Sequence, residues 1–184
     1  MESLLWRYTS IRRGTRALRQ LKRNFVDWNE VRVSHVEEIA DAMANTEWAI
    51  ESAAQIRRLL EKLFMLRSEV SLDFLTDLTK AQGRAFLHSM PGVSDDLADE
   101  VLLFSAEVNV LPITEHSARM AYRLGLVPNA RVTKKNQQRL GKLWEPEVYP
   151  AIAQFFLDHA PEMCEEKEPD HENCVLEELC PKEE

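Results

Sequence analysis

Apolar residues recur at helical spacing along most of the chain, and they nowhere alternate as they would in a half-buried strand. Two stripes step by three and four positions between residues 28 and 67. They are Val33, Val36, Ile39, Ala40 and Met43, followed by Ala53, Ile56, Leu59, Leu60, Leu63 and Phe64. Such spacing is typical of amphipathic helices that bury one face. We therefore predict an all-α protein whose core is formed by these stripes.

Helix signals continue to the end of the chain. Ser71 is suited to cap a short helix, and further helices are expected at about 79–88, 95–108, 113–125, 133–143 and 148–159. The first 23 residues carry seven Lys and Arg against one acid, and their apolar positions are only loosely helical. This basic segment predicts either a solvated helix face or a surface that meets phosphates.

Length and composition narrow the class of protein. With 184 residues and 45% hydrophobic side chains, the chain can bury one domain or two small lobes. No apolar run approaches the ~20 residues that span a bilayer. The first 23 residues lack the pattern of a secretory signal. We expect a cytoplasmic protein with no membrane partner.

The net charge of −8 is concentrated at the C-terminal end. Residues 161–184 hold ten acids, two bases and all three cysteines, so the preceding residues are neutral overall. An odd number of cysteines excludes a closed set of internal disulfides. Cys164, His171, Cys174 and Cys180 offer three thiols and an imidazole within 17 residues. These donors suit an iron–sulfur cluster or tetrahedral zinc, and stray cysteines in an acidic tail are the remaining alternative.

A Pro-Gly turn separates two of the expected helices. The stretch Met90-Pro91-Gly92-Val93-Ser94 lies between them and predicts a tight helix–hairpin–helix. Ser94 is placed to cap the second helix, and Asp95 and Asp96 in its first turn suit the positive end of the helix dipole.

Three features of the chain, from about Leu72 to Cys180, together resemble the endonuclease III family of helix–hairpin–helix DNA glycosylases. They are the hairpin, the step Ile113-Thr114-Glu115-His116 and the terminal cysteines. The family's cluster ligands are four cysteines separated by six, two and five residues. The spacing is intact here, and His171 stands in the second position. The resemblance implies a [4Fe-4S] cluster with Cys3His ligation; zinc or no metal stays open. It also implies two lobes, one from 24 to 117 containing the hairpin and the other from 1–23 plus 118–184.

The positions that carry the family's chemistry differ in this chain. The lysine that forms a Schiff base in bifunctional members aligns with Asp96, which cannot form an imine. The family's catalytic aspartate aligns with Thr114, which has no ionisable carboxylate, and Glu115 lies about 100° further around a helix. No catalytic residue is therefore assigned. We expect a member that lacks glycosylase and lyase activity and serves DNA repair as a DNA- or partner-binding or redox module. An active glycosylase or abasic-site enzyme with rebuilt catalytic residues is the alternative, and a purely structural interaction protein is a third.

Features that favour and oppose DNA binding lie in different segments. The resemblance implies a phosphate-binding hairpin at Pro91, Gly92, Val93 and Ser94, because backbone N–H groups at a helix start attract anions. However, Ser94 replaces the family's second glycine, and Asp95, Asp96 and the acidic 165–170 loop repel phosphates. Basic residues at 1–23 and at 131–142 favour DNA. We expect weak or altered binding to double-stranded DNA, with a protein partner as the other expectation.

Overall fold

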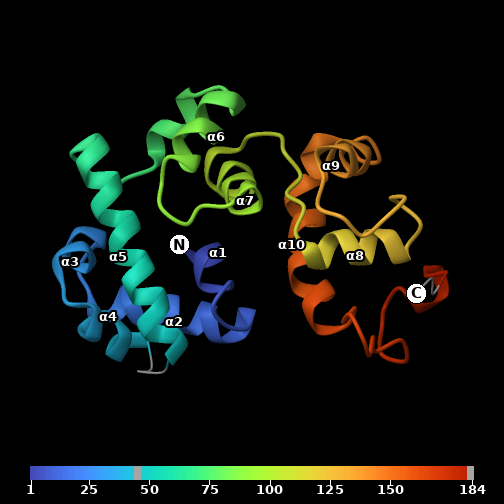
Figure 1. Cartoon of the computed structure of the whole chain (residues 1–184), viewed down its shortest axis with the longest axis horizontal. Helices are drawn as coiled ribbons and strands as arrows, with labels where there is room; N and C mark the ends of the chain where they lie inside the picture. The colour runs from blue at the N-terminus through green and yellow to red at the C-terminus, as the bar shows by residue number, and fades with distance from the viewer. Residues whose placement is uncertain (44–46, 182–184) are drawn as a thin grey trace. The chain divides into compact units, whose positions relative to one another are not determined.

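The chain is all-helical throughout the part that the structure describes. The computed structural model describes residues 1–43 and 47–181, and every regular element in these ranges is an α-helix or a short 3-10 helix (Figure 1). The predicted all-α class is confirmed. None of the helices in these ranges is long and apolar enough to cross a membrane.

The chain divides into two compact units, Met1–Val101 and Leu102–Glu184. The first unit contains these helices: α1 (Glu2–Leu5), α2 (Ile11–Asn24), α3 (Trp28–Val33), α4 (Val36–Met43), α5 (Glu47–Arg67), the 3-10 helix η1 (Asp73–Asp77) and α6 (Lys80–His88). Helix α7 (Asp95–Ala106) begins in the first unit and ends in the second. The second unit continues with α8 (Glu115–Arg123), α9 (Lys134–Gly141), η2 (Pro146–Val148), α10 (Tyr149–Glu162) and η3 (Glu177–Leu179).

The core of the first unit is built from the apolar stripes seen in the sequence. Helices α3 and α4 pack on α5, and α2 packs on α4. Ile39, Ala53 and Ile56 are fully buried there, together with Leu5 and Leu21 from the N-terminal segment. Burying a Leu or Ile side chain contributes about 1.5–3 kcal/mol, so these contacts anchor the basic N-terminal segment to this unit.

The N-terminal segment differs from its prediction in one respect. It forms two helices, α1 and α2, instead of one loosely patterned helix. Its buried leucines also share a core with α3, α4 and α5 inside the unit Met1–Val101. The sequence led us to expect residues 1–23 in a lobe with 118–184, and that discontinuous lobe stays a prediction.

The second unit has a smaller core between α8 and α10. Met120, Phe156 and Ala160 are buried at its centre. Cys164 and Leu176 from the acidic C-terminal segment pack against these residues. The acidic segment is therefore attached to the folded body of this unit through its few apolar side chains.

Helix ends follow the local signals in the sequence. Thr79 caps α6 and exchanges hydrogen bonds with Gln82 in a capping box. Thr133 caps α9 by accepting from the backbone N–H of Asn136. Ser71 accepts from the backbone N–H of Asp73, but the element that follows is a short 3-10 helix whose cap position is Leu72, so the predicted cap is displaced by one residue. These caps fix where α6 and α9 begin, and α6 in turn leads directly into the hairpin.

Candidate functional site

The hairpin between α6 and α7 closes through a four-residue turn. The backbone N–H of Val93 donates to the carbonyl of Met90 at 3.4 Å, and Gly92 has a φ of +72°. Pro91 in the second position and a glycine of positive φ in the third are what a type II turn requires. The predicted residues Pro91, Gly92 and Val93 thus belong to this turn and Ser94 joins it to α7; Gly92 and Ser94 are exposed.

A buried glutamine from α5 supports this turn from beneath. Gln55 is 6% exposed, and its side-chain amide donates to the carbonyl of Pro91. A Cβ added at Gly92 would lie 3.0 Å from the Gln55 side-chain carbon Cδ. Gly92 is therefore required both by its backbone angle and by the close approach of Gln55.

Acidic residues line the start of α7, and each of three has a basic partner. Asp95 lies 2.9 Å from the imidazole of His88, and Asp99, 2% exposed, forms two hydrogen bonds with Arg84. Asp96, which the sequence resemblance aligns with the family's lysine, accepts from the guanidinium of Arg7 at 2.7 Å.

Arg7 also reaches a second carboxylate one turn further along α7. Its guanidinium lies 3.2 Å from Glu100, whose side chain is fully buried. Burial raises the pKa of Glu100 although Arg7 opposes the shift. Burial raises the pKa of Asp96 as well, but the hydrogen bond from Ser94 and the charge of Arg7 outweigh it, and that pKa lies below its usual range. Asp96 is therefore ionised at neutral pH and held by an arginine.

Thr114, which the sequence resemblance aligns with the family's aspartate, caps the start of α8. Its hydroxyl accepts from the backbone N–H of Ser117 at 3.1 Å, and its own N–H donates to the Ser117 hydroxyl at 2.8 Å. Both residues are thus used in a capping box that satisfies the start of the helix. Glu115 is exposed on the next position of the same helix. Thr114 belongs to the second unit and Asp96 to the first.

The four predicted metal ligands line one cavity of the second unit. Cys164, His171, Cys174 and Cys180 surround a volume of about 20 Å³. His159 joins them: its Nε2 lies 3.3 Å from the Cys174 sulfur, and burial lowers the pKa of its imidazole. Within residues 1–43 and 47–181, however, no three His, Cys, Asp or Glu side chains are arranged so as to hold a metal ion.

Two arginines of α8 hold the cysteine-bearing segment. Arg119 donates to the carbonyl of Cys164 at 2.9 Å. Arg123 donates to the carbonyls of Glu165 and Glu166 at 2.6 and 3.0 Å, and to the Cys164 sulfur at 3.3 Å. These bonds satisfy backbone carbonyls of an acidic loop with cationic donors, which are stronger than neutral ones.

The donor set fits a thiolate-binding metal group. Three thiols and one or two imidazoles face a common space, and Arg123 places a positive charge next to one sulfur. Thiolates with imidazole are ligands for zinc and for iron–sulfur clusters. A space of about 20 Å³ is close to that of a single water molecule. In their present positions no three of these donors are placed to hold a metal ion, so they would have to move to bind either a single ion or a four-iron cluster.

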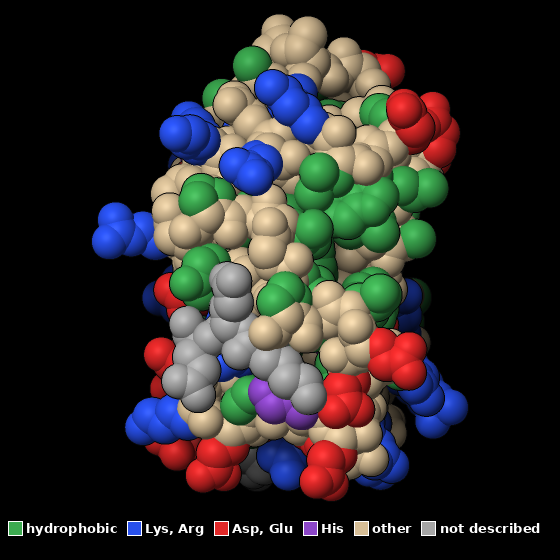
Figure 2. Space-filling view, turned by 90° about the vertical axis from the view of Figure 1, so that its right-hand side faces the viewer, with side chains coloured by type: hydrophobic (Ala, Val, Ile, Leu, Met, Phe, Trp, Pro, Cys, Tyr) green, Lys and Arg blue, Asp and Glu red, His purple; other side chains and the backbone are tan. Residues whose placement is uncertain are grey.

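Basic side chains gather on two helices. Arg131, Lys134, Lys135 and Lys142 are exposed on and beside α9, and Figure 2 shows Lys and Arg side chains in the upper part of the face that includes this helix. Helix α2 carries Arg12, Arg13, Arg16, Arg19, Lys22 and Arg23, with no acidic residue between Ile11 and Asn24. Both basic segments predicted from the sequence are therefore surface helices.

Several of these residues were not singled out by the sequence. Gln55 supports the hairpin from 36 residues away, and Glu100 and Arg7 meet only through the fold. Nothing in the local pattern marks such long-range pairs. Arg119 and Arg123 could have been found, because a spacing of four on a helix places two side chains on one face.

Comparison with known proteins gives a consistent set of relatives. No family model matches the chain. It is 24% identical over 160 residues to DNA glycosylase/AP lyase ROS1 of Arabidopsis thaliana, covering 87% of this chain and 11% of that protein. A putative DNA glycosylase of the same plant is 27% identical over 76% of this chain and 47% of its own length. Endonuclease III of Sulfolobus acidocaldarius is 24% identical over 81% of this chain and 65% of its own length. The chain thus spans less than two thirds of each of these proteins.

Solved structures share the fold at low sequence identity. A non-covalent endonuclease III–DNA complex matches with a TM-score of 0.74 and 16% identity, over 98% of this chain and 80% of the other. A thermostable thymine-DNA glycosylase matches with a TM-score of 0.74 and 14% identity, over 98% and 81%. With the hairpin and the spacing of the cysteines, these likenesses confirm the resemblance: the chain is a divergent relative of the endonuclease III-like helix–hairpin–helix DNA glycosylases.

Proposed function

We propose that this chain binds double-stranded DNA in a base-excision repair context without carrying out the glycosylase or lyase chemistry of its relatives. The relatives are named as DNA glycosylases, and the chain has their helical fold. Activity belongs to particular residues and not to a fold, so the state of the catalytic positions decides the proposal.

The observation that carries the proposal is the ion pair between Asp96 and Arg7. A Schiff base needs an unprotonated amine aimed at the sugar, and this position holds a carboxylate tied to a guanidinium. Thr114 gives independent support, because its hydroxyl caps α8 and it cannot oppose a developing positive charge on the sugar. Loss of such a charge would slow base release by several powers of ten, because the rate falls tenfold for each ~1.4 kcal/mol added to the activation free energy.

The hairpin remains suited to contact a phosphate. Its turn is braced by Gln55 and presents Gly92 and Ser94 at the surface, next to the N-terminal end of α7. The repulsion expected from the neighbouring carboxylates is reduced at Asp96, because the guanidinium of Arg7 lies against it. We therefore expect duplex binding that is weak, independent of sequence and reduced by salt.

We further propose that Cys164, His171, Cys174 and Cys180 hold an iron–sulfur cluster, with zinc as the second candidate. Such a group would supply a structural cross-link and, if it is a cluster, one-electron redox chemistry. The protein's own part is to fix the segment that carries these donors. Arg119 and Arg123 bind its backbone, and Leu176 packs on the core of the second unit.

One experiment tests the DNA part of the proposal. The purified chain is titrated onto duplexes that carry an abasic site, an oxidised pyrimidine or a mismatch, and onto an undamaged duplex, at several salt concentrations. We expect similar binding to all of them, with affinity falling as salt rises, and no base release or strand cleavage. Release or cleavage of any lesion above an Asp96→Ala, Thr114→Ala control would support the enzyme alternative.

A second experiment tests the metal part. Iron, sulfide and zinc are measured in the purified protein and in His171→Ala and His159→Ala variants. A Cys3His cluster predicts iron with sulfide, loss in His171→Ala and retention in His159→Ala. Zinc in stoichiometric amount would replace the cluster by the second candidate, and retention of metal in His171→Ala would remove that residue from the ligand set.

A further inference from the structure

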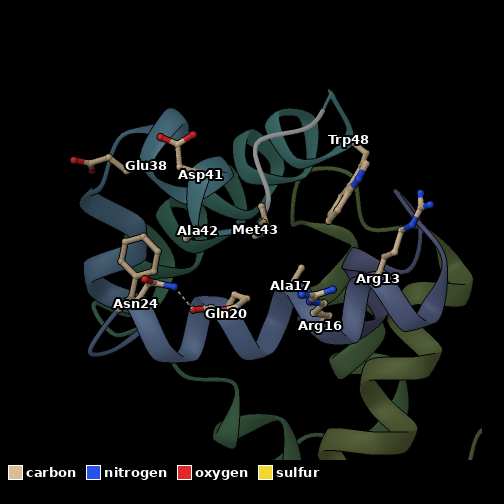
Figure 3. Close-up of a pocket in the computed structure, with 11 residues that line it drawn as sticks. Arg13, Arg16, Ala17, Gln20, Asn24, Glu38, Asp41, Ala42, Met43 and Trp48 are labelled. Atoms are coloured by element: carbon tan, nitrogen blue, oxygen red, sulfur yellow. Dashed lines mark hydrogen bonds between the residues drawn. The ribbon is translucent and has the colours of Figure 1, made fainter.

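A broad trough on the first unit is separate from the residues used by the hairpin. It lies between α2 and α4 and has a volume of about 1020 Å³ (Figure 3). Its floor is apolar, with Ala17 of α2 and Met43 of α4 both buried. A trough of this size, open to solvent and lined by side chains of three kinds, is large enough for a ligand of several rings.

The α2 wall of the trough is cationic. Arg13 and Arg16 line it and are exposed. They stand one turn apart on a helix that has six basic residues and no acid between Ile11 and Asn24. One guanidinium group can bind two oxygens of a phosphate at once, so this wall suits an anionic backbone.

An indole ring lies over the same end of the trough. Trp48, at the start of α5, packs partly on the core and is partly exposed, and Figure 3 shows it on the side of the trough where Arg13 lies. An aromatic face beside two arginines is the combination that single-stranded nucleic acids use: the ring stacks on a base and the cations meet the phosphates.

The α4 wall is acidic. Glu38 and Asp41 of α4 belong to the lining of the trough and both are exposed, and in Figure 3 they extend from the side of α4 that is turned away from α2. Carboxylates repel phosphates, so they direct an anionic backbone toward α2. They also accept hydrogen bonds from exocyclic amino groups, such as that of cytosine. The two walls are therefore complementary to the two sides of a nucleotide.

We propose that this trough is a second nucleic-acid site that takes unpaired nucleotides. The phosphates lie along Arg13 and Arg16, a base stacks on Trp48, and the amino edge of a base faces Asp41. The inference goes beyond the proposed function, which concerns duplex DNA at the hairpin, and each can fail without the other because one is tested with single strands and the other with duplexes.

The test measures binding of fluorescent eight-nucleotide strands, (dC)8 and (dT)8, by anisotropy at low salt. The variant Arg13→Gln/Arg16→Gln is compared with Arg12→Gln/Arg19→Gln, which removes the same charge from exposed positions of the same helix that do not line the trough. We expect at least tenfold weaker binding of (dC)8 by the first pair and less than threefold by the second. Loss of two phosphate contacts should also flatten the logarithmic salt dependence by about 1.4.

Two further variants examine the base. Trp48→Leu should weaken binding about tenfold, as expected for loss of one stacked base, and circular dichroism confirms that the variant is folded. Asp41→Asn does not disturb the core and should reduce the preference for (dC)8 over (dT)8. Equal loss in both arginine pairs, or no difference between the two strands in the unmodified protein, would overturn the proposal. Binding of an acidic helical peptide in place of (dC)8, with the same dependence on Arg13 and Arg16, would do so as well.

Discussion

Replacing Gly92 by alanine tests whether the hairpin depends on its contact with α5. The new Cβ would lie 3.0 Å from Gln55 Cδ, and the residue must keep a φ of +72°. A left-handed conformation costs a residue with a side chain about 1–2 kcal/mol. Displacing the Gln55 amide from the Pro91 carbonyl leaves buried polar groups unpaired, which adds about 1–3 kcal/mol. We therefore expect a loss of about 2–5 kcal/mol in the free energy of unfolding.

Gly125 provides a matched control. It has nearly the same φ, +71°, but no atom lies within 4 Å of where its Cβ would be. Gly125→Ala should therefore cost only the backbone part, about 1–2 kcal/mol. Combining Gly92→Ala with Gln55→Ala removes the obstruction, so the cost of the alanine should fall to that same value. The difference is a coupling energy of about 1–3 kcal/mol.

Urea unfolding followed by tryptophan fluorescence and circular dichroism measures these changes. Trp6, Trp28 and Trp48 belong to the first unit and Trp144 to the second, so fluorescence mainly follows the unit that contains the hairpin. Equal costs for Gly92→Ala and Gly125→Ala, or additive effects of the Gln55 and Gly92 changes, would refute the claim that the turn is held by Gln55.

The remaining predictions concern the catalytic positions and the cysteine-bearing segment. The pKa of Glu100 is raised, so the stability linked to its protonated form is present below the ordinary pKa of 4.5 and is lost as pH rises through the folded-state pKa. Glu100→Gln should therefore be at least as stable as the native chain at pH 7. Urea titrations should show this difference in stability vanishing toward pH 4. The pKa of Asp96 is lowered, so Asp96→Asn should show the opposite pattern, with lower stability at pH 7 and convergence with the native chain as pH falls below 3.8. Thr114→Ala should cost about 1 kcal/mol by loss of the cap while Thr114→Ser costs a few tenths, and equal losses in thermal unfolding would show that the hydroxyl does not cap α8. Arg123→Ala should free the 164–166 backbone and so raise the rate at which Cys164 reacts with a thiol reagent in metal-free protein. The control Arg139→Ala removes a hydrogen bond to the carbonyl of Leu126 and should leave that rate unchanged.

The helical fold could be predicted from the sequence because its signals are local. The apolar stripes of α4 and α5 repeat every three or four residues, and Thr79 and Thr133 mark helix starts that the structure reproduces. The Pro91-Gly92 turn has the same quality, since proline and a glycine of positive φ define it without reference to the rest of the chain.

The surroundings of the candidate sites could be predicted only in part. The order of the cysteines and His171 is readable, and the structure brings these residues to one cavity. The partners of Asp96 and Pro91 could not be predicted, because Arg7 and Gln55 reach them from 89 and 36 residues away. Nothing in the sequence around Arg7 or Gln55 indicates these contacts. The N-terminal segment illustrates the same limit: its charge suggested a surface, but its packing with α4 depends on buried leucines at unremarkable positions.

The central claim is that the chain binds duplex DNA and leaves it chemically intact. Both halves of this claim are tested in one sample. A labelled duplex that carries one abasic site is incubated with excess protein, and bound strands are then separated from free strands and cleaved strands from intact ones. We predict a retained, salt-sensitive complex in which the strand is uncut and no covalent adduct forms after borohydride reduction. A borohydride-trapped adduct or a cleaved strand would contradict it.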